Sequence, residues 1–354
     1  MSEDLALDRF PGEYEGGVEL PRTELPESGQ GKFSGNKIGA AYVDGGFDDF
    51  ELQKERLAGY DQIYIKTSTA PFHGRFTSAY LENGISVDLE YVNSGMHQHV
   101  GCPEDGIGLS VSLGPPGTVV NGVEVDQNKL ILTRPGSELN VDVMPEGGRF
   151  LLLSVRRSAV EAMVSEDSRL GDFVRERGQA SIVNALCTAE GFTGGVQSLL
   201  KFCGQLQGQG LPGSMVANLL AVIVEALELE VENSAVNGRQ HCRPYRQSYA
   251  TFAQARDALT TMEEFDYAAL TAATGLSPRA IQLAFAQYGS TTPHRYFRIL
   301  KLHRARNALR AGPGDCKATI GDIAAAHGFW SPSRFTQMYR QLFGELPSET
   351  RARA

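Results

Sequence analysis

The sequence predicts an α+β protein of several domains, in which a β-rich segment and a helical segment precede a C-terminal domain built only of helices. Between residues 46 and 158 the apolar residues recur with period two, and between 159 and 232 the period lengthens to that of helices. From residue 248 onward the pattern is helical, with no strand-like stretch. The chain has 354 residues and is 42% hydrophobic, enough for two or three domains with buried cores.

The N-terminal 45 residues are rich in Gly, Pro and Glu and predict a disordered acidic leader. The start of the chain is acidic where an export signal needs basic residues. The most apolar stretch is shorter than the roughly 18 residues of a membrane span. The five cysteines form no CxxC pair, which argues against a zinc finger or a disulfide framework. We therefore expect a cytoplasmic protein with reduced thiols and no contact with membranes.

The β-rich segment, 46–158, is punctuated by frequent turns. Its alternation is clearest over 85–91 and 139–143, and Asn83-Gly84 predicts a tight hairpin. Gly and Pro between 114 and 117 mark another turn. Many short strands joined by tight turns predict a small antiparallel barrel or sandwich.

The following segment, 159–232, predicts helices over 159–165, 180–188, 193–206 and 213–230. The last of these is apolar almost all round, so it is either buried in its own domain or packed on a second copy of the chain. Residues 233–247 are polar, contain Gly and Pro, and predict a linker.

Charge is divided unevenly along the chain, whose formal net charge is −9. Residues 241–354 hold 15 Lys and Arg against 8 Asp and Glu, a charge of +7, whereas residues 1–240 hold 18 against 34, a charge of −16. A basic domain joined to an acidic body is typical of nucleic-acid binding.

The C-terminal region contains an internal repeat of about 54 residues, the spacing from Ser277 to Ser331. Each copy has an Ala-rich segment, a Gly turn, a Ser-Pro helix start and a longer amphipathic segment. Gly is suited to the left-handed residue that ends a helix, Ser to the N-cap, and Pro to the first helical position. Each copy therefore predicts a helix-turn-helix motif, over about 267–289 and 320–343.

Residues 293–311 join the two copies and predict a helix of about 28 Å at 1.5 Å per residue. This length is near the roughly 34 Å repeat of DNA, so two reading heads could enter successive major grooves. The helix is strongly basic, through Arg295, Arg298, Lys301, Arg304, Arg306 and Arg310.

With these residues in place, the stretch from about 250 to 351 resembles the DNA-binding domain of the AraC/XylS family of bacterial transcription regulators. The matching blocks are GLSPRAIQLAF, PHRYFRILKLHRARNAL and IGDIAAAHGFWSPSRFTQMYRQLFGELPSETR, in that order. The resemblance implies two helix-turn-helix motifs that bind promoter DNA, a homodimer, and recruitment of RNA polymerase by an activator.

The resemblance also implies which residues read bases, namely Arg279, Gln282, Leu283, Ser333, Arg334 and Gln337. Arg and Gln are suited to guanine and adenine edges, and Leu283 to a thymine methyl. The expected interface is completed by Ser277 and Ser331 at the helix starts and by Arg295, Thr336 and Arg340 on the exposed faces.

The resemblance further implies that residues 46–158 form a cupin-like sensor barrel and 159–232 a dimerising helical region, before a DNA-binding domain over 248–354. His97 and His99, with Glu104, have the spacing of the first motif of a metal cupin, but the second half offers Glu138 and Asn140 where another His is needed. We therefore expect no metal and no cofactor, and assign His97 and His99 to an unknown small-molecule effector.

Two other functions remain open beside the transcription regulator. The β-rich domain and the apolar helix could dock a regulatory protein instead of a small molecule. The chain could also be a cupin-type metalloenzyme, although it offers fewer metal ligands than such a site needs. No other catalytic motif is present, and we expect no enzyme activity.

Overall fold

The structure is a computed structural model that describes ten ranges of the chain. They are 37–38, 40–57, 59–81, 84–164, 169–184, 186–206, 211–236, 247–288, 291–311 and 318–353. The greater part of the expected leader, residues 1–36, and most of the expected linker, 237–246, lie outside the described residues.

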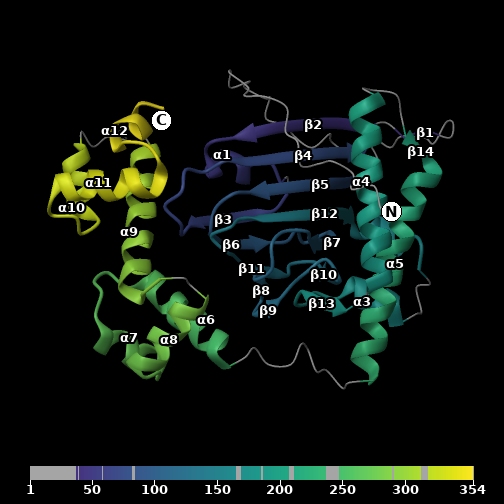
Figure 1. The fold of residues 1–354 in the computed structure, drawn as a ribbon. Helices are drawn as coiled ribbons and strands as arrows, with labels where there is room; N and C mark the ends of the chain where they lie inside the picture. The colour runs from purple at the N-terminus through teal and green to yellow at the C-terminus, as the bar shows by residue number, and fades with distance from the viewer. Residues whose placement is uncertain are drawn as a thin grey trace, which may run out of the picture. The chain divides into compact units, whose positions relative to one another are not determined.

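The β-rich segment folds into two antiparallel sheets, which Figure 1 colours purple to teal. The larger sheet has seven strands in the order β13-β10-β7-β12-β5-β4-β2. Its strands are β2 (Ala40–Phe47), β4 (Gly74–Leu81), β5 (Ile85–Val92), β7 (Gly106–Ser112), β10 (Lys129–Thr133), β12 (Gly148–Arg156) and β13 (Ser181–Asn184).

The smaller sheet has five strands in the order β3-β6-β11-β8-β9. Its strands are β3 (Asp61–Lys66), β6 (Met96–Gly101), β11 (Glu138–Val143), β8 (Val119–Val120) and β9 (Val123–Glu124). A short helix, α1 (Phe50–Lys54), precedes β3 and begins at Asp49, whose side chain accepts a hydrogen bond from the Glu51 amide. A separate two-stranded ladder joins β1 (Lys37–Ile38) and β14 (Leu211–Pro212).

The space between the sheets is filled by the inward residues of each alternating strand. Phe150 and Ile131 of the larger sheet pack with Met96, Val100 and Val141 of the smaller one. Of the two predicted forms, barrel or sandwich, the barrel is not closed, because in the described residues no hydrogen-bonded strand pair joins the two sheets. Each short strand pairs within its own sheet, and side chains close the gap, so the domain is an open sandwich.

The outer face of the larger sheet is covered by helices. These are α2 (Arg157–Glu161), α3 (Arg169–Arg175), α4 (Leu186–Leu206) and α5 (Gly213–Val236). Leu151 and Leu153 of β12 point to this side and pack with Phe192 of α4 and Ile223 of α5. Part of the apolar surface of α5 is therefore buried in its own domain.

Two boundaries differ from the sequence prediction. Residues 180–188 were expected to be helical, but 181–184 form β13, because Ile182 and Val183 complete the edge of the larger sheet beside β10. Tertiary pairing here outweighs the local pattern. The expected disordered leader ended at 45, whereas β2 begins at Ala40 and pairs with β4 along its whole length.

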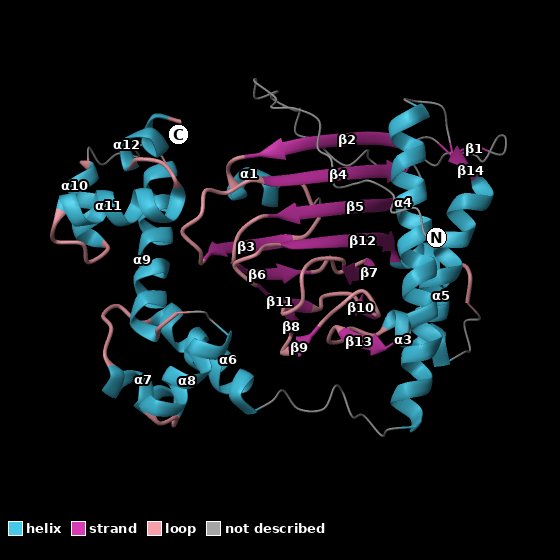
Figure 2. Cartoon of the chain, viewed as in Figure 1, coloured by secondary structure: helices cyan, strands magenta, loops and turns pink. Residues whose placement is uncertain are grey.

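The C-terminal part is helical throughout, as predicted and as the cyan ribbons of Figure 2 show. Its helices are α6 (Gln247–Thr261), α7 (Tyr267–Thr274), α8 (Pro278–Tyr288), α9 (Pro293–Arg310), α10 (Ile320–Ala326), α11 (Pro332–Phe343) and α12 (Pro347–Ala352). Among the helices described, none combines the length and the hydropathy needed to cross a membrane.

Candidate nucleic-acid interface

The first helix pair, α7 and α8, has the local geometry that the repeat predicts. The Asp266 carboxylate accepts hydrogen bonds from the Ala268 and Ala269 amides and starts α7. Gly275 ends it with φ of 68°, a left-handed conformation that glycine adopts at no steric cost. The Ser277 hydroxyl then accepts a hydrogen bond from the Ala280 amide at 3.2 Å, and Pro278 is the first residue of α8.

The buried face of α8 fixes which side chains remain outside. Ile281 and Phe285 are fully buried and pack with Phe252 of α6 and Tyr296 of α9. The opposite face carries Arg279, Gln282 and Leu283, all of them exposed. Leu283 is 58% exposed, so its apolar side chain is open to a partner.

The second pair, α10 and α11, repeats this geometry with one difference. Thr319 and Asp322 form a reciprocal capping box at the start of α10, and Gly328 has φ of 82°. Ser331 occupies the N-cap position of α11, but its side chain makes no capping hydrogen bond. Pro332 again is the first helical residue.

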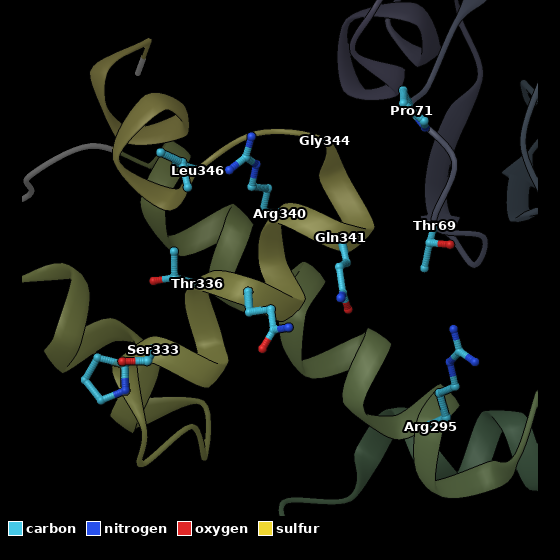
Figure 3. A pocket seen from close by; sticks show the side chains of 11 residues that line it. Thr69, Pro71, Arg295, Ser333, Thr336, Arg340, Gln341, Gly344 and Leu346 are labelled. Atoms are coloured by element: carbon cyan, nitrogen blue, oxygen red, sulfur yellow. The ribbon is translucent and has the colours of Figure 1, made fainter.

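The exposed face of α11 borders a groove of about 1150 Å³ (Figure 3). Phe335 and Tyr339 are buried on the other side of the helix. The predicted residues that line the groove are Arg295, Ser333, Thr336, Gln337 and Arg340. Arg334 is exposed on the same helix but does not line the groove.

Two exposed residues of this region were missed by sequence reasoning. Gln341 lines the groove four residues after Gln337, so helical spacing could have found it. Trp330, the only Trp of the chain, is 84% exposed in the turn before α11. The groove also reaches Thr69 and Pro71, from the segment between β3 and β4.

The joining helix α9 has 18 residues, about 27 Å, close to the expected length. Several of its basic side chains are engaged within the chain. Lys301 lies 3.4 Å from the Glu263 carboxylate, and Arg310 lies 2.8 Å from Asp49. Arg295 is exposed beside α11, which leaves its charge available to a phosphate.

His97 and His99 belong to neither helix pair. Both lie on β6, on the outer face of the smaller sheet. The His97 Nδ1 is 2.9 Å from Asp142, and the His99 Nδ1 is 3.3 Å from the Asn140 side chain. Glu104 instead pairs with Arg177 at 2.5 Å. Among the described residues, no group of three His, Cys, Asp or Glu side chains could hold a metal ion.

Asp142 connects this sheet face to α6. Its carboxylate accepts a hydrogen bond from the Tyr249 hydroxyl at 2.7 Å and lies 3.7 Å from Arg256. Burial alone would raise the pKa of Asp142, but His97, Arg256 and the hydrogen bonds lower it below its ordinary value. Burial lowers the pKa of His97, and the neighbouring Asp142 carboxylate opposes this shift.

A second set of contacts connects the sandwich to α9 and α11. The buried Arg306 guanidinium is 2.9 Å from Asp49 and 3.1 Å from Glu345. It also lies over the rings of Phe50 and Phe343. These contacts link a sandwich residue directly to the segment that follows α11.

Lys66 of β3 adds to this second set. Its Nζ donates to the Leu342 carbonyl, in the last turn of α11, at 2.7 Å. The His303 Nε2 lies 3.1 Å from the Lys66 carbonyl. Burial, and then the charge of Arg306, lowers the pKa of Lys66 to about 8.

Comparison with known proteins matches the C-terminal region. Residues 270–353 match a family described as "Helix-turn-helix domain". The XylDLEGF operon transcriptional activator of Pseudomonas putida is 40% identical over 75 residues, which are 21% of this chain and 23% of that protein. The probable thc operon regulatory protein of Rhodococcus erythropolis is 40% identical over 76 residues, 21% of this chain and 22% of that protein.

Among the solved structures that match part of the chain is a regulator of similar kind. It is a probable AraC family transcriptional regulator from Rhodopseudomonas palustris CGA009, with 31% identity, 30% of this chain and 97% of that chain covered, and a TM-score of 0.28. The chain spans about a fifth of the length of the curated relatives that it matches.

Proposed function

Because its C-terminal helices make the chain a member of the AraC/XylS family, we propose that it is a sequence-specific, DNA-binding regulator of transcription. The observation that carries this proposal is the repetition of one geometry. Two helix pairs present polar exposed faces, Arg279 and Gln282 on α8 and Arg334 and Gln337 on α11, at the two ends of the 18-residue α9. The 18-residue α9 that joins them is about 27 Å long, near the roughly 34 Å repeat of DNA, which suits neighbouring major grooves of one duplex.

Within this proposal each site residue has a role. Arg279, Gln282 and Leu283 read one group of bases, and Ser333, Arg334 and Gln337 read another. Arg295, Thr336 and Arg340 contact the sugar-phosphate backbone of the DNA at the edge of the α11 groove. Ser277 and Ser331 lie at the starts of helices, where a DNA phosphate is favoured. The DNA-binding unit comprises residues 248–354.

The rest of the chain serves regulation. The sandwich acts as a cupin-like sensor without enzyme activity, α4 and α5 contribute to a homodimer, and the protein activates transcription in the cytoplasm by engaging RNA polymerase. The similarity to the XylDLEGF operon transcriptional activator of Pseudomonas putida supports activation over repression. The sandwich contacts α6, α9 and α11 directly, through Asp142, Asp49 and Lys66. A change in the sandwich can therefore reach both helix pairs.

Selection of duplexes from a random double-stranded DNA library by the full chain tests this function. The expected product is a sequence with two conserved blocks about 10 base pairs apart from centre to centre. An enriched pool without any conserved block, or no retention of DNA at 50 mM salt, would overturn the proposal, since phosphate contacts are strongest at low salt.

A further inference from the structure

A cavity of about 450 Å³ lies between the outer face of the smaller sheet and the helices α6 and α9. The sheet contributes Ile63, His97, His99 and Asn140 to its wall, and the helices contribute Tyr296 and Arg304 among others. Its size falls within the roughly 300–1,000 Å³ typical of sites for small molecules. The two histidines that the sequence assigns to an effector therefore face this cavity, not the interior of the sandwich.

The interior of the sandwich offers much less room. The cavity between the two sheets, beside Tyr64 and Glu90, measures only about 50 Å³. That volume holds a few water molecules, each of which needs about 10–15 Å³ of such space. An organic effector could not enter there without separating the sheets, whereas the outer cavity has room for one.

One wall of the outer cavity carries a polar atom that lacks a partner. Tyr296 of α9 is 1% exposed, and within the described part of the chain its hydroxyl makes no hydrogen bond. A buried hydroxyl left unpaired is unfavourable, because it has lost its hydrogen bonds to water without replacement. A bound molecule with a polar group would satisfy it.

The charges around the cavity are balanced except at one residue. Lys54 pairs with Glu51, and Arg256 pairs with Asp142 and Asp257. His97 lies 2.9 Å from the Asp142 carboxylate, and burial lowers the pKa of His303 to about 3, which keeps that imidazole neutral. Arg304 donates to the Thr260 carbonyl, and among the described residues no carboxylate pairs with it. The cavity thus retains one cationic group for a ligand.

The remaining wall is apolar. Ile63 and Ile65 from β3 face Leu300 from α9 across the cavity. Ile63 is 54% exposed, although isoleucine is among the residues most often buried. An apolar body resting here would cover that side chain from water.

We infer that this cavity is an effector site for a small organic monoanion with an apolar body, whose anionic group lies at Arg304 and whose polar edge meets the Tyr296 hydroxyl. The role of the bound molecule as an effector rests on the proposed function. Binding of the anion in this cavity does not. Its walls include β6 and β11, which carry the His97–Asp142–Tyr249 contacts, and α9, which joins the two helix pairs. A molecule bound here therefore contacts both the sensor and the DNA-binding helices, and any difference in its affinity between two arrangements shifts their populations.

The probe for a test is 8-anilinonaphthalene-1-sulfonate, a fluorescent monoanion with an apolar body. The full chain is expected to bind one equivalent with saturation. N-phenyl-1-naphthylamine, which has the same rings without the sulfonate, should bind at least tenfold more weakly. Arg304→Gln and Tyr296→Phe should each weaken binding of the sulfonate at least fivefold. Arg298→Gln, on the same helix but away from the cavity, is the matched control and should bind like the wild type.

Tyr296→Phe also separates a ligand contact from a structural one. Removing an unpaired hydroxyl should leave the melting temperature without probe unchanged or higher, while probe binding weakens. The site is refuted if the sulfonate does not saturate below 1 mM, or if Arg304→Gln and Tyr296→Phe bind it as the wild type does.

The effector role is measured separately on DNA. Saturating sulfonate should change the affinity of the full chain for a selected duplex at least threefold in either direction, and an unchanged affinity would overturn that role. Probe binding needs no DNA. It can therefore fail while duplex selection succeeds, or succeed while selection fails, and the two proposals remain distinguishable.

Discussion

The two helix pairs, α7–α8 and α10–α11, share the same helix-turn-helix backbone but differ in their caps and in their contacts with the sandwich. The pair α7–α8 is capped by the Ser277 hydroxyl and is held to the sandwich through α6, by the network around Asp142. The pair α10–α11 has no hydroxyl cap at Ser331 and is held through Arg306 and Lys66. The repeat therefore specifies the local turn, while long-range charge contacts specify how each pair is attached.

The exposed faces differ as well. Leu283 gives the α8 face an apolar centre, whereas the α11 face is polar along its length and looks across a groove at Thr69 and Pro71. If α11 enters a major groove as proposed, this segment of the sandwich lies across the groove from it. We therefore expect the sandwich to affect access of DNA to the second pair more directly than to the first.

The largest effect is expected at the attachment of the second pair. Arg306→Met leaves Asp49 and Glu345 without their buried partner and should lower the free energy of unfolding by about 3–5 kcal/mol. Arg310→Met is the matched control, because Arg310 also pairs with Asp49 but is 30% exposed, and should lose at most about 1 kcal/mol. Urea unfolding followed by circular dichroism measures both; equal losses would mean that burial of the pair contributes nothing.

The next effect concerns base reading. Arg334→Ala should lose about 1–3 kcal/mol of binding to a selected duplex and relax the preference at one base pair. Leu283→Ala, which removes an apolar contact to a thymine methyl, should lose less and affect a base pair in the other block. Competition gel shifts with single-base variants of the duplex measure the two patterns. A uniform weakening across all sequences would make Arg334 a phosphate contact.

Acid should weaken the attachment of the second pair through His303. Burial lowers the pKa of His303 to about 3, so the folded chain keeps it neutral where the unfolded chain, with an ordinary pKa near 6.5, takes up a proton. Its contribution is complete above pH 6.5 and is progressively lost below it. Between pH 7.5 and 5.5 this amounts to about 1.4 kcal/mol. His303→Gln should lose that much less stability over the same interval; parallel curves for the two proteins would contradict the assignment.

The smallest effect distinguishes the two caps. Ser277→Ala removes a hydrogen bond to the Ala280 amide and should cost about 1 kcal/mol of unfolding free energy. Ser331→Ala removes no such bond and should cost close to nothing. Thermal unfolding of the two variants compares them directly, and a greater loss at Ser331 would reverse the comparison.

The sequence was sufficient for features that depend on near neighbours. Gly275 and Gly328 do adopt positive φ, Pro278 and Pro332 do begin helices, and the alternation over 85–91 does form β5. Local pattern could not reveal that 181–184 would complete a sheet edge, or that the sheets would remain open, because both depend on distant partners.

The same limit applies to the sites. Asp49 and Arg306 are 257 residues apart in the chain, and nothing near either residue indicates that they pair. The spacing of His97 and His99 on one strand matches a metal-cupin motif, and they are predicted as effector residues only because the second half of that motif is missing. Their exposure to a cavity shared with α9 came only from the packing of the C-terminal helices on the sheet. The assignment of individual base contacts stays a prediction.

The central claim is that α8 and α11 read two blocks of one duplex about one helical turn apart. Inserting five base pairs between the blocks of a selected duplex rotates one block by half a turn and tests this most directly. We expect affinity to fall to that of a duplex with a single block. Inserting ten base pairs should not restore it, because the 18-residue α9 limits the separation of the two pairs. Unchanged affinity after the five-base-pair insertion would contradict it.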